Sequence, residues 1–216
     1  MPNADVEFDR LVGRIRACRI CVEKPVGQPL PHAPRPVVRG RPGARLAIFG
    51  QAPGTRVHAS GVPFTDPSGD RLRDWLGIDA EAFYNEERVA ILPMGFCFPG
   101  LDAKGADLPP RRECAPAWRK QVIAVLPRLE LTLLVGGYAQ AWHLEGEAAR
   151  SVTATVADWR RILALPRKPR LLPLPHPSWR NTGWLKANPW FGDELLPVLR
   201  DEVRRLLGEP GKTSRS

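Results

Sequence analysis

Four short apolar runs constrain the fold of this chain more than any other feature. The runs span residues 45–50 (RLAIFG), 89–95 (VAILPMG), 131–137 (LTLLVGG) and 171–177 (LLPLPHP). Each is almost continuous in Leu, Ile, Val and Ala and ends at Gly or Pro, as parallel strands covered on both faces do. Helix-compatible segments lie between and after them, at 68–77 (with Ser68 as a candidate cap), 113–129, 137–144 and 193–208. This alternation predicts a three-layer α/β domain with a mostly parallel sheet.

The length of 216 residues fits a single domain, which we expect to span residues 1–208. A hydrophobic content of 43% excludes a chain that is disordered throughout. Residues 22–44 are too rich in Pro for a helix or a central strand and should form an extended surface loop. Residues 209–216 (EPGKTSRS) are expected to be a flexible tail.

The formal net charge of +9 and the pI near 10.0 indicate a polyanionic partner such as nucleic acid, although basic charge also serves solubility. No apolar run is long enough to span a membrane, and the N-terminus is too polar for a secretory signal. We therefore expect a cytoplasmic protein with reduced thiols and no membrane partner, and a monomer suits this size.

The residues that follow the four runs indicate a binding site. Ligands of parallel sheets bind beyond the carboxyl ends of the strands. The first run leads into GQAPG (50–54), which supplies free backbone and the amide of Gln51. The fourth run leads into His176-Pro177-Ser178, which supplies an imidazole and a hydroxyl. Met94-Gly95-Phe96-Cys97 and Gly136-Gly137-Tyr138 end the other two runs, and ordinary turn chemistry explains the paired glycines.

The four cysteines form a second candidate site. Cys18 and Cys21 have CxxC spacing, and Cys97 and Cys114 lie further along the chain. In a reducing compartment such a set more often binds a metal than forms disulfides. Four thiolates suit either zinc or an iron–sulfur cluster.

Three motifs in this order resemble the uracil-DNA glycosylase superfamily, and its families four and five most closely. They are GQAPG, GVPFTDPSGDRL at 61–72 and HPSWRN at 176–181, and the resemblance extends over about residues 15–200. It implies an α/β/α fold around a four-stranded parallel sheet. It also implies hydrolysis of the N-glycosidic bond to uracil, or to another deaminated base, in single- or double-stranded DNA, which leaves an abasic site.

The resemblance assigns roles to the site residues. Phe64 corresponds to the phenylalanine that stacks on the flipped base, and His176 to the histidine that stabilises the departing base anion. Backbone N–H groups of the 51–54 loop are free to hold the base edge, because its glycines leave the approach open. The expected substrate-binding set is Gly50, Ala52, Pro53, Gly54, Phe64, Ser178 (on a phosphate) and Asn181 (on the base or supporting the HPS loop).

This chain departs from the family where the water is activated. Family four has an acid at the position of Gln51, and another branch has an Asp at the position of Ala52. Gln51 can only position a water by hydrogen bonding, so Asp66 is the proposed catalytic carboxylate; a local turn before Pro67 is the alternative role. The family-four Asn on the second strand is replaced by Leu92-Pro93-Met94, which predicts relaxed discrimination between bases.

The same resemblance implies a [4Fe–4S] cluster on Cys18, Cys21, Cys97 and Cys114, with zinc as the alternative metal. The role of the cluster is expected to be structural. DNA contacts are expected from Trp179, Arg180 and Lys186, whereas Trp184 and Trp190 are expected to pack the C-terminal helix. Residues 98–113 contain no His, so we expect turnover and not the covalent capture known in some relatives. The competing hypothesis is a DNA-binding iron–sulfur protein with a degenerate, non-catalytic site.

Overall fold

A four-stranded parallel sheet forms the centre of the molecule, as the computed structural model describes it for residues 4–208. The strands are β1 (Leu46–Phe49), β2 (Val89–Ile91), β3 (Leu131–Val135) and β4 (Arg170–Leu174), in the order β2-β1-β3-β4. All neighbouring pairs are parallel, and Leu46 of β1 is in register with both Val89 and Leu131. The four apolar runs therefore correctly predicted the sheet.

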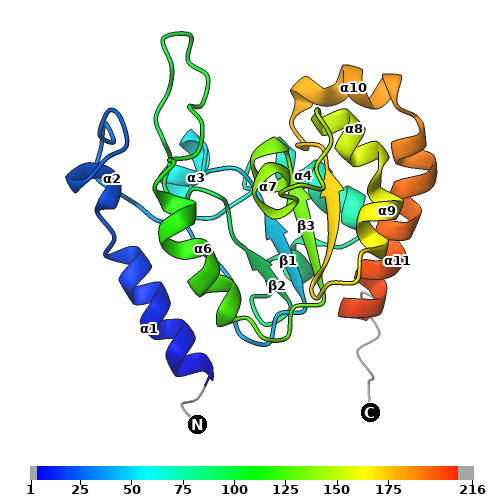
Figure 1. Ribbon diagram of the computed structural model, residues 1–216, viewed down its shortest axis with the longest axis horizontal. Helices are drawn as coiled ribbons and strands as arrows, with labels where there is room; N and C mark the ends of the chain where they lie inside the picture. Colours follow the sequence, from blue (N-terminus) through cyan, green and yellow to red (C-terminus); the bar gives the residue numbers. More distant parts are fainter. Residues whose placement is uncertain (1–3, 209–216) are drawn as a thin grey trace.

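The two faces of the sheet support two separate cores, and the result is the expected three-layer arrangement (Figure 1). Ala47 and Phe49 face one core, which helices α1 (Ala4–Arg16) and α6 (Cys114–Ala124) cover. Leu46 and Ile48 face the other, which α4 (Pro67–Leu76), α11 (Leu196–Leu207) and Trp159 of α9 (Trp159–Ala164) cover. Alternate residues of one apolar strand thus serve opposite layers.

Short elements complete the fold. They are α2 (Ile20–Glu23), α3 (Thr55–Ser60), α5 (Ala80–Tyr84), α7 (Gly137–His143), α8 (Val152–Ala157), α10 (Thr182–Ala187), a 3₁₀ turn (Trp179–Asn181) and a π turn (Phe191–Leu195). The expected loop of residues 22–44 begins later than predicted, because α2 includes Val22 and Glu23, which precede the first Pro of the segment. The rest, as far as residue 44, has no helix, and Arg39 pairs with Ile91 at the β2 edge of the sheet. Pro197 lies in the first turn of α11, where its missing N–H is tolerated.

The start of α4 corrects one sequence expectation. The N-cap is Asp66, not Ser68, because the Asp66 carboxylate accepts hydrogen bonds from the N–H groups of Ser68 and Gly69. Pro67 then occupies the first turn of the helix.

The carboxyl ends of the four strands together form one edge of the sheet, and α3 and α10 begin beyond it (Figure 1). The loop of residues 98–113, between β2 and α6, extends beyond the same edge. No helix of residues 4–208 is long and apolar enough to cross a membrane. The expected tail, 209–216, lies outside the described residues.

Candidate functional site

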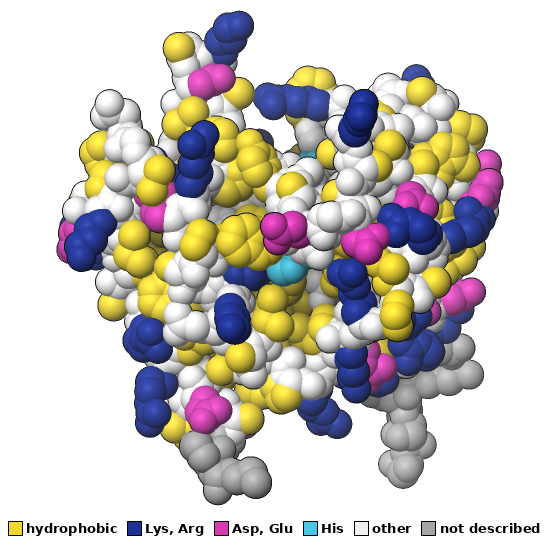
Figure 2. Space-filling model, viewed as in Figure 1, with side chains coloured by type: hydrophobic (Ala, Val, Ile, Leu, Met, Phe, Trp, Pro, Cys, Tyr) yellow, Lys and Arg dark blue, Asp and Glu magenta, His cyan; other side chains and the backbone are white. Residues whose placement is uncertain are grey.

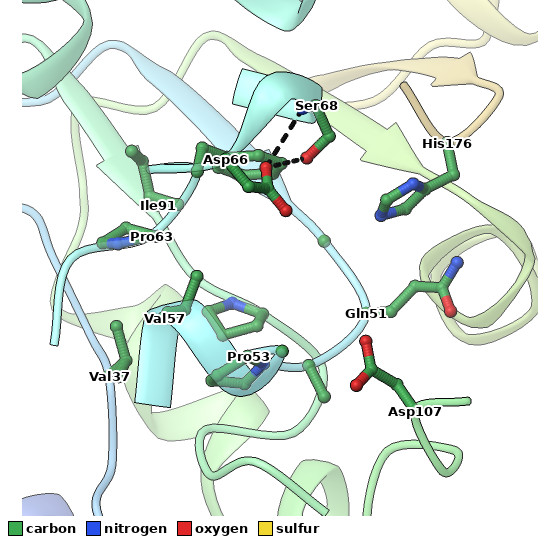
Figure 3. A pocket seen from close by; sticks show the side chains of 15 residues that line it. Val37, Gln51, Pro53, Val57, Pro63, Asp66, Ser68, Ile91, Asp107 and His176 are labelled. Atoms are coloured by element: carbon green, nitrogen blue, oxygen red, sulfur yellow. Dashed lines mark hydrogen bonds between the residues drawn. The ribbon is translucent and has the colours of Figure 1, made fainter. Parts of the chain in front are cut away.

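A cavity of about 100 Å³ opens at this edge of the sheet (Figure 3). A single water needs roughly 10–15 Å³, so the cavity has room for a planar group of several heavy atoms. It brings together Gly50, Gln51, Ala52, Pro53 and Gly54 of the first motif, Phe64, Asp66 and Ser68 of the second, and His176. Ser178 and Asn181, which were also expected to bind the substrate, do not line this cavity and lie instead on the adjoining groove. The remaining lining residues are Val37, Val57, Pro63, Ile91, Pro93 and Asp107.

The GQAPG loop presents backbone to this cavity. Its first two carbonyls are tied to the loop after β2, because Met94 N–H donates to Gly50 O and Gly95 N–H to Gln51 O, both at 2.9 Å. The N–H groups of Ala52 and Gly54 donate no hydrogen bond within residues 4–208. The two donors are therefore without a partner in the described part of the chain, and their contact with a base stays a prediction.

Phe64 is held in an uncommon backbone conformation, with φ of +56°. The ring end of Phe64 lies close to Gly50, where an added Cβ would be 3.6 Å from Cζ. Behind it, the ring packs edge-on against Phe83 with centroids 5.9 Å apart. A bulky residue rarely adopts this conformation, and here it places the aromatic ring on the cavity wall.

His176 is oriented by the residues that follow it. Ser178 N–H donates to His176 Nδ1 at 3.2 Å, so Nδ1 is an acceptor and the proton of the neutral ring is on Nε2. Asn181 Nδ2 donates to the His176 carbonyl at 2.7 Å and thus supports the loop. Burial lowers the pKa of His176 from its usual value, against an opposing effect of Asp66, so the ring is neutral at pH 7.

The Ser178 hydroxyl has a local partner. Its Oγ accepts a hydrogen bond from Arg180 N–H at 3.2 Å and caps the 3₁₀ turn. Arg71, on α4, donates to the Ser178 carbonyl at 2.9 Å and fastens the HPS loop to that helix. Both contacts hold the segment that carries His176.

Gln51 extends its amide between His176 and Asp107 (Figure 3). The amide packs against Gly136, where an added Cβ would lie only 2.6 Å from Gln51 Nε2. Gly136 has φ of +84°, so both its conformation and its missing side chain are needed here. The Gly136-Gly137 pair, explained from sequence as a turn, also makes room for the site.

Asp66 performs the local role that was its alternative interpretation. Its Oδ1 accepts hydrogen bonds from Ser68 Oγ and from the N–H groups of Ser68 and Gly69. The other carboxylate oxygen makes no hydrogen bond within the described chain and faces the cavity (Figure 3). Asp66 is therefore both a helix cap and part of the site wall.

Asp107 is a carboxylate of the site that sequence reasoning missed. It comes from the loop between Cys97 and Cys114 and points toward Gln51 (Figure 3). An added Cβ on Gly54 would lie 3.1 Å from Asp107 Oδ2, so the last glycine of GQAPG makes room for this side chain. Asp107 is solvent-exposed overall, yet surrounding protein raises the pKa of its carboxyl, with Asp66 adding to the rise and Arg180 opposing it.

The wall after β2 carries no amide of the kind that reads bases in family four. Ile91 and Pro93 face the cavity instead, and Leu92 is buried in the core below. Arg119, itself 2% exposed, donates hydrogen bonds to the carbonyls of Leu92 and Pro93. The wall is thus apolar and fixed from behind.

A wider groove continues from the cavity along the surface. It is lined by Trp179, Arg180, Tyr138, Leu108, Pro109 and Pro110, among others. Trp179 is 71% exposed and stacks with Arg180, and Tyr138 is 46% exposed. On the face of the molecule that Figure 2 draws, basic side chains are spread out rather than gathered in one patch.

Lys186, the third expected DNA contact, lies on α10 and is exposed. Trp184 and Trp190 pack edge-on against each other and against Phe191 under α10 and α11, as their expected packing role requires. Tyr138 was treated as part of a turn, and only the fold shows that it lines the groove.

All four cysteines line a second cavity, with Pro34, Pro36, Phe96 and Trp118 around them. Burial raises the pKa of Cys21 to about 11 and of Cys97 and Cys114 to about 12, so these thiols stay protonated at neutral pH unless a metal is bound. Among residues 4–208, no three His, Cys, Asp or Glu side chains are arranged to hold a single metal ion. The donor set is soft and convergent, but it does not form a compact tetrahedral site.

Comparison with known families agrees with this geometry. The family model of the uracil DNA glycosylase superfamily matches residues 37–200, which include the sheet and all three motifs of the cavity. The match begins after Cys18 and Cys21, so it does not bear on the CxxC pair. This chain belongs to the uracil DNA glycosylase superfamily.

Proposed function

We propose that this protein is a monofunctional DNA glycosylase, which hydrolyses the N-glycosidic bond of uracil or another deaminated base in DNA and leaves an abasic site. Its superfamily supports DNA glycosylase chemistry in general. The flipped base would enter the cavity, with its ring on Phe64 and its edge at the free N–H groups of Ala52 and Gly54.

The orientation of His176 is the observation that carries this proposal. A base leaves as an anion, and the anion needs a donor that is already aimed at it. Ser178 N–H fixes the His176 tautomer, so that Nε2–H is the donor, and the lowered pKa keeps the ring neutral. A donor of this kind contributes about 2.7–4 kcal/mol to the stability of a transition state in other enzymes.

The apolar wall of Ile91 and Pro93 supports a relaxed choice of base. Discrimination is strong where a buried polar group of the site is left unpaired by the wrong ligand. Within the cavity, the second strand offers no such group. The deaminated bases uracil, hypoxanthine and xanthine are therefore candidates for excision, and the adduct ethenocytosine tests how far the relaxed choice extends.

The competing function is DNA binding without catalysis. It is favoured by one observation, the absence of an acid at Gln51 and Ala52 in the water-activating loop. This argument is weakened by Asp66 and Asp107, because they supply carboxylates to the same cavity although the GQAPG motif contains no acid.

A panel of oligonucleotides tests the proposal. Single- and double-stranded DNA that carries each of the four lesions is incubated with the protein, and abasic sites and free base are measured. We expect release from at least the uracil substrate, and His176→Ala should lower the single-turnover rate by about 10²–10³-fold with DNA binding retained. Salt-sensitive binding with no base release from any substrate would instead establish the non-catalytic function.

The cofactor is a separate proposal: Cys18, Cys21, Cys97 and Cys114 bind a [4Fe–4S] cluster. Support comes from the shared cavity and from the soft donor set. Zinc, which four thiolates also suit, is the alternative, and the resemblance to family four favours the cluster. When bound, the cluster would fasten α1 and α2 to the loop that leads into α6 and supply no redox step to hydrolysis.

Anaerobic purification tests this assignment. We expect iron and acid-labile sulfide in equal amounts, a brown colour, and loss of both on Cys97→Ala. Stoichiometric zinc without iron, or no bound metal at all, would refute the cluster.

A further inference from the structure

Asp107 places a carboxylate beside Gln51, the motif position at which this chain lacks an acid. Gln51 and His176 line the same cavity, and the Asp107 carboxylate points toward Gln51 (Figure 3). Its Oδ2 lies against Gly54, on the loop whose backbone would hold the base. Asp107 therefore faces the same space as the groups that would hold the base and stabilise its departure.

The backbone of Asp107 is anchored although it belongs to a long loop. Leu101 and Asp107 form an antiparallel bridge, and Leu108 N–H donates to Gly100 O at 2.9 Å. The turn between them is closed by Asp102, whose Oδ1 accepts from the N–H groups of Lys104 and Ala106. The loop thus presents Asp107 from a small hairpin with its own hydrogen bonds.

The Asp107 carboxylate also has no hydrogen-bond or ion-pair partner in the described part of the chain. Within residues 4–208 it accepts no hydrogen bond and forms no ion pair, whereas Asp66 uses one oxygen to cap α4. The groups that face Asp107 are Gly54 and Gln51 from the motif loop, Asp66 from the start of α4, and His176 and Arg180 from the segment after β4. Both oxygens of Asp107 are free for a water.

We propose that Asp107 is a catalytic residue that binds the attacking water and takes its proton. This inference rests on the proposed glycosylase function. The bond between sugar C1′ and the base nitrogen breaks, and its electron pair leaves with the base. The water oxygen bonds to C1′ and passes one proton to Asp107, which later releases it to solvent, while the departing anion at His176 Nε2–H takes up a proton from solvent.

If Asp107 takes the proton of the water, residue 51 needs only to orient that water, which explains why it is an amide. A carboxylate at position 51 would place a second negative charge beside Asp107, and like charges that share a site oppose ionisation. The Gln51 amide instead offers a donor and an acceptor, which orient the water without competing for its proton. The raised pKa of Asp107 makes it a stronger base than an ordinary carboxylate.

Asp107→Asn tests the inference, because the amide keeps the shape and the hydrogen-bonding atoms but removes the basic group. We expect a fall of about 10²–10⁴-fold in the single-turnover rate of base release. Affinity for DNA with a non-cleavable uracil analogue should be no weaker, since a negative charge near the phosphates is lost. Asp193→Asn, an exposed acid that lines neither the cavity nor the groove, is the matched control with unchanged rate.

External formate gives a second readout that does not depend on Asp107→Asn. Asp107→Gly opens space for a small carboxylate, and formate should restore release in this variant but not in His176→Ala. Should Asp107→Asn also lose DNA binding, rescue of Asp107→Gly still supports the assignment and failure of rescue overturns it.

The outcomes separate this inference from the proposed function. Wild-type protein that releases base while Asp107→Asn is equally fast overturns the role of Asp107 alone. A rate loss in Asp66→Asn with none in Asp107→Asn moves the base to Asp66. Wild-type protein that releases no base from any lesion overturns the glycosylase function and this inference together.

Discussion

The Tyr84 hydroxyl holds the carbonyl of Phe64, at 3.0 Å, and lies 2.9 Å from the carbonyl of Pro63. The single hydroxyl proton is shared between these two acceptors and fixes the strained turn at Phe64 from below. Gly69 completes the support, because its missing side chain leaves the space that the Phe64 carbonyl occupies: an added Cβ would lie 1.9 Å from that oxygen. The proposed base-stacking ring therefore depends on two residues that do not line the cavity.

Gly69→Ala is expected to displace Phe64 and weaken base binding. The clash is with backbone, so it cannot be relieved by a rotamer change. Lower thermal stability should accompany a loss of affinity for DNA that carries a uracil analogue. Gly13→Ala is the matched control: it faces open space in α1, so it should stabilise the protein by about 0.5–1 kcal/mol and leave binding unchanged. Equal affinity of Gly69→Ala and wild type would contradict this account of Phe64.

Asp66→Ala and Asp66→Asn should separate the cap of α4 from the charge. Asn is as good an N-cap as Asp, whereas Ala removes the acceptor for Ser68 and Gly69. Asp66→Ala should therefore destabilise the protein by about 0.5–2 kcal/mol, and Asp66→Asn by much less. Chemical denaturation at neutral pH measures both. A large and equal loss in the two variants would show that the charge, not the cap, is what the fold requires.

Trp179→Ala should weaken DNA binding without changing stability, because the indole is 71% exposed. Stacking on a base is worth roughly 1–3 kcal/mol, so the dissociation constant for single-stranded DNA should rise about 5–150-fold. Trp184→Ala is the contrasting variant: Trp184 packs on Phe191 and its Nε1 donates to Thr153 Oγ1 at 2.8 Å, so it should lower the melting temperature. Unchanged binding by Trp179→Ala would remove this residue from the DNA interface.

His143 should make the protein sensitive to acid. Burial is the main cause that lowers the pKa of His143 to about 3, and the charge of Arg119 adds to it. The unfolded chain takes up this proton below about pH 6.5 while the folded chain resists it, so stability is full above that pH and is lost as the pH falls toward 3. At pH 4.5 the cost is on the order of 2–3 kcal/mol.

His143→Leu should therefore reduce the difference in free energy of unfolding between pH 7.5 and pH 4.5. The exposed Glu145→Gln is the control and should leave that difference unchanged. Urea titrations at the two pH values measure it. An undiminished difference in His143→Leu would place the acid sensitivity elsewhere.

The sheet was predictable because each strand is apolar on both faces, and the motif order fixed which loops meet at its edge. The cap of α4 was misassigned although a signal existed, since Pro67 favours the first helical turn and so identifies Asp66 as the residue before it. Asp107 could not be found in this way. Its place depends on the path of a long loop, which no periodicity encodes, and on the space left by Gly54.

Arg180 and Asp66 should shift the acid limb of base release in opposite directions. Burial raises the pKa of Asp107, the positive charge of Arg180 opposes the rise, and the negative charge of Asp66 adds to it. The proposed base must be ionised, so activity falls as the pH drops through this pKa. Arg180→Gln should therefore move the acid limb to higher pH, and Asp66→Asn, which keeps the helix cap, should move it to lower pH.

Single-turnover rates between pH 4 and pH 8, at saturating protein, measure these shifts separately from DNA affinity. Of these two variants, Arg180→Gln should weaken affinity, with a salt dependence reduced by about 0.7–0.9 in the slope of log K against log salt if one phosphate contact is lost. Lys186→Gln, also cationic and exposed but absent from the cavity and the groove, should leave the acid limb in place. Shifts of the same sign in Arg180→Gln and Asp66→Asn would exclude Asp107 as the group that titrates, because the positive charge of Arg180 lowers its pKa and the negative charge of Asp66 raises it.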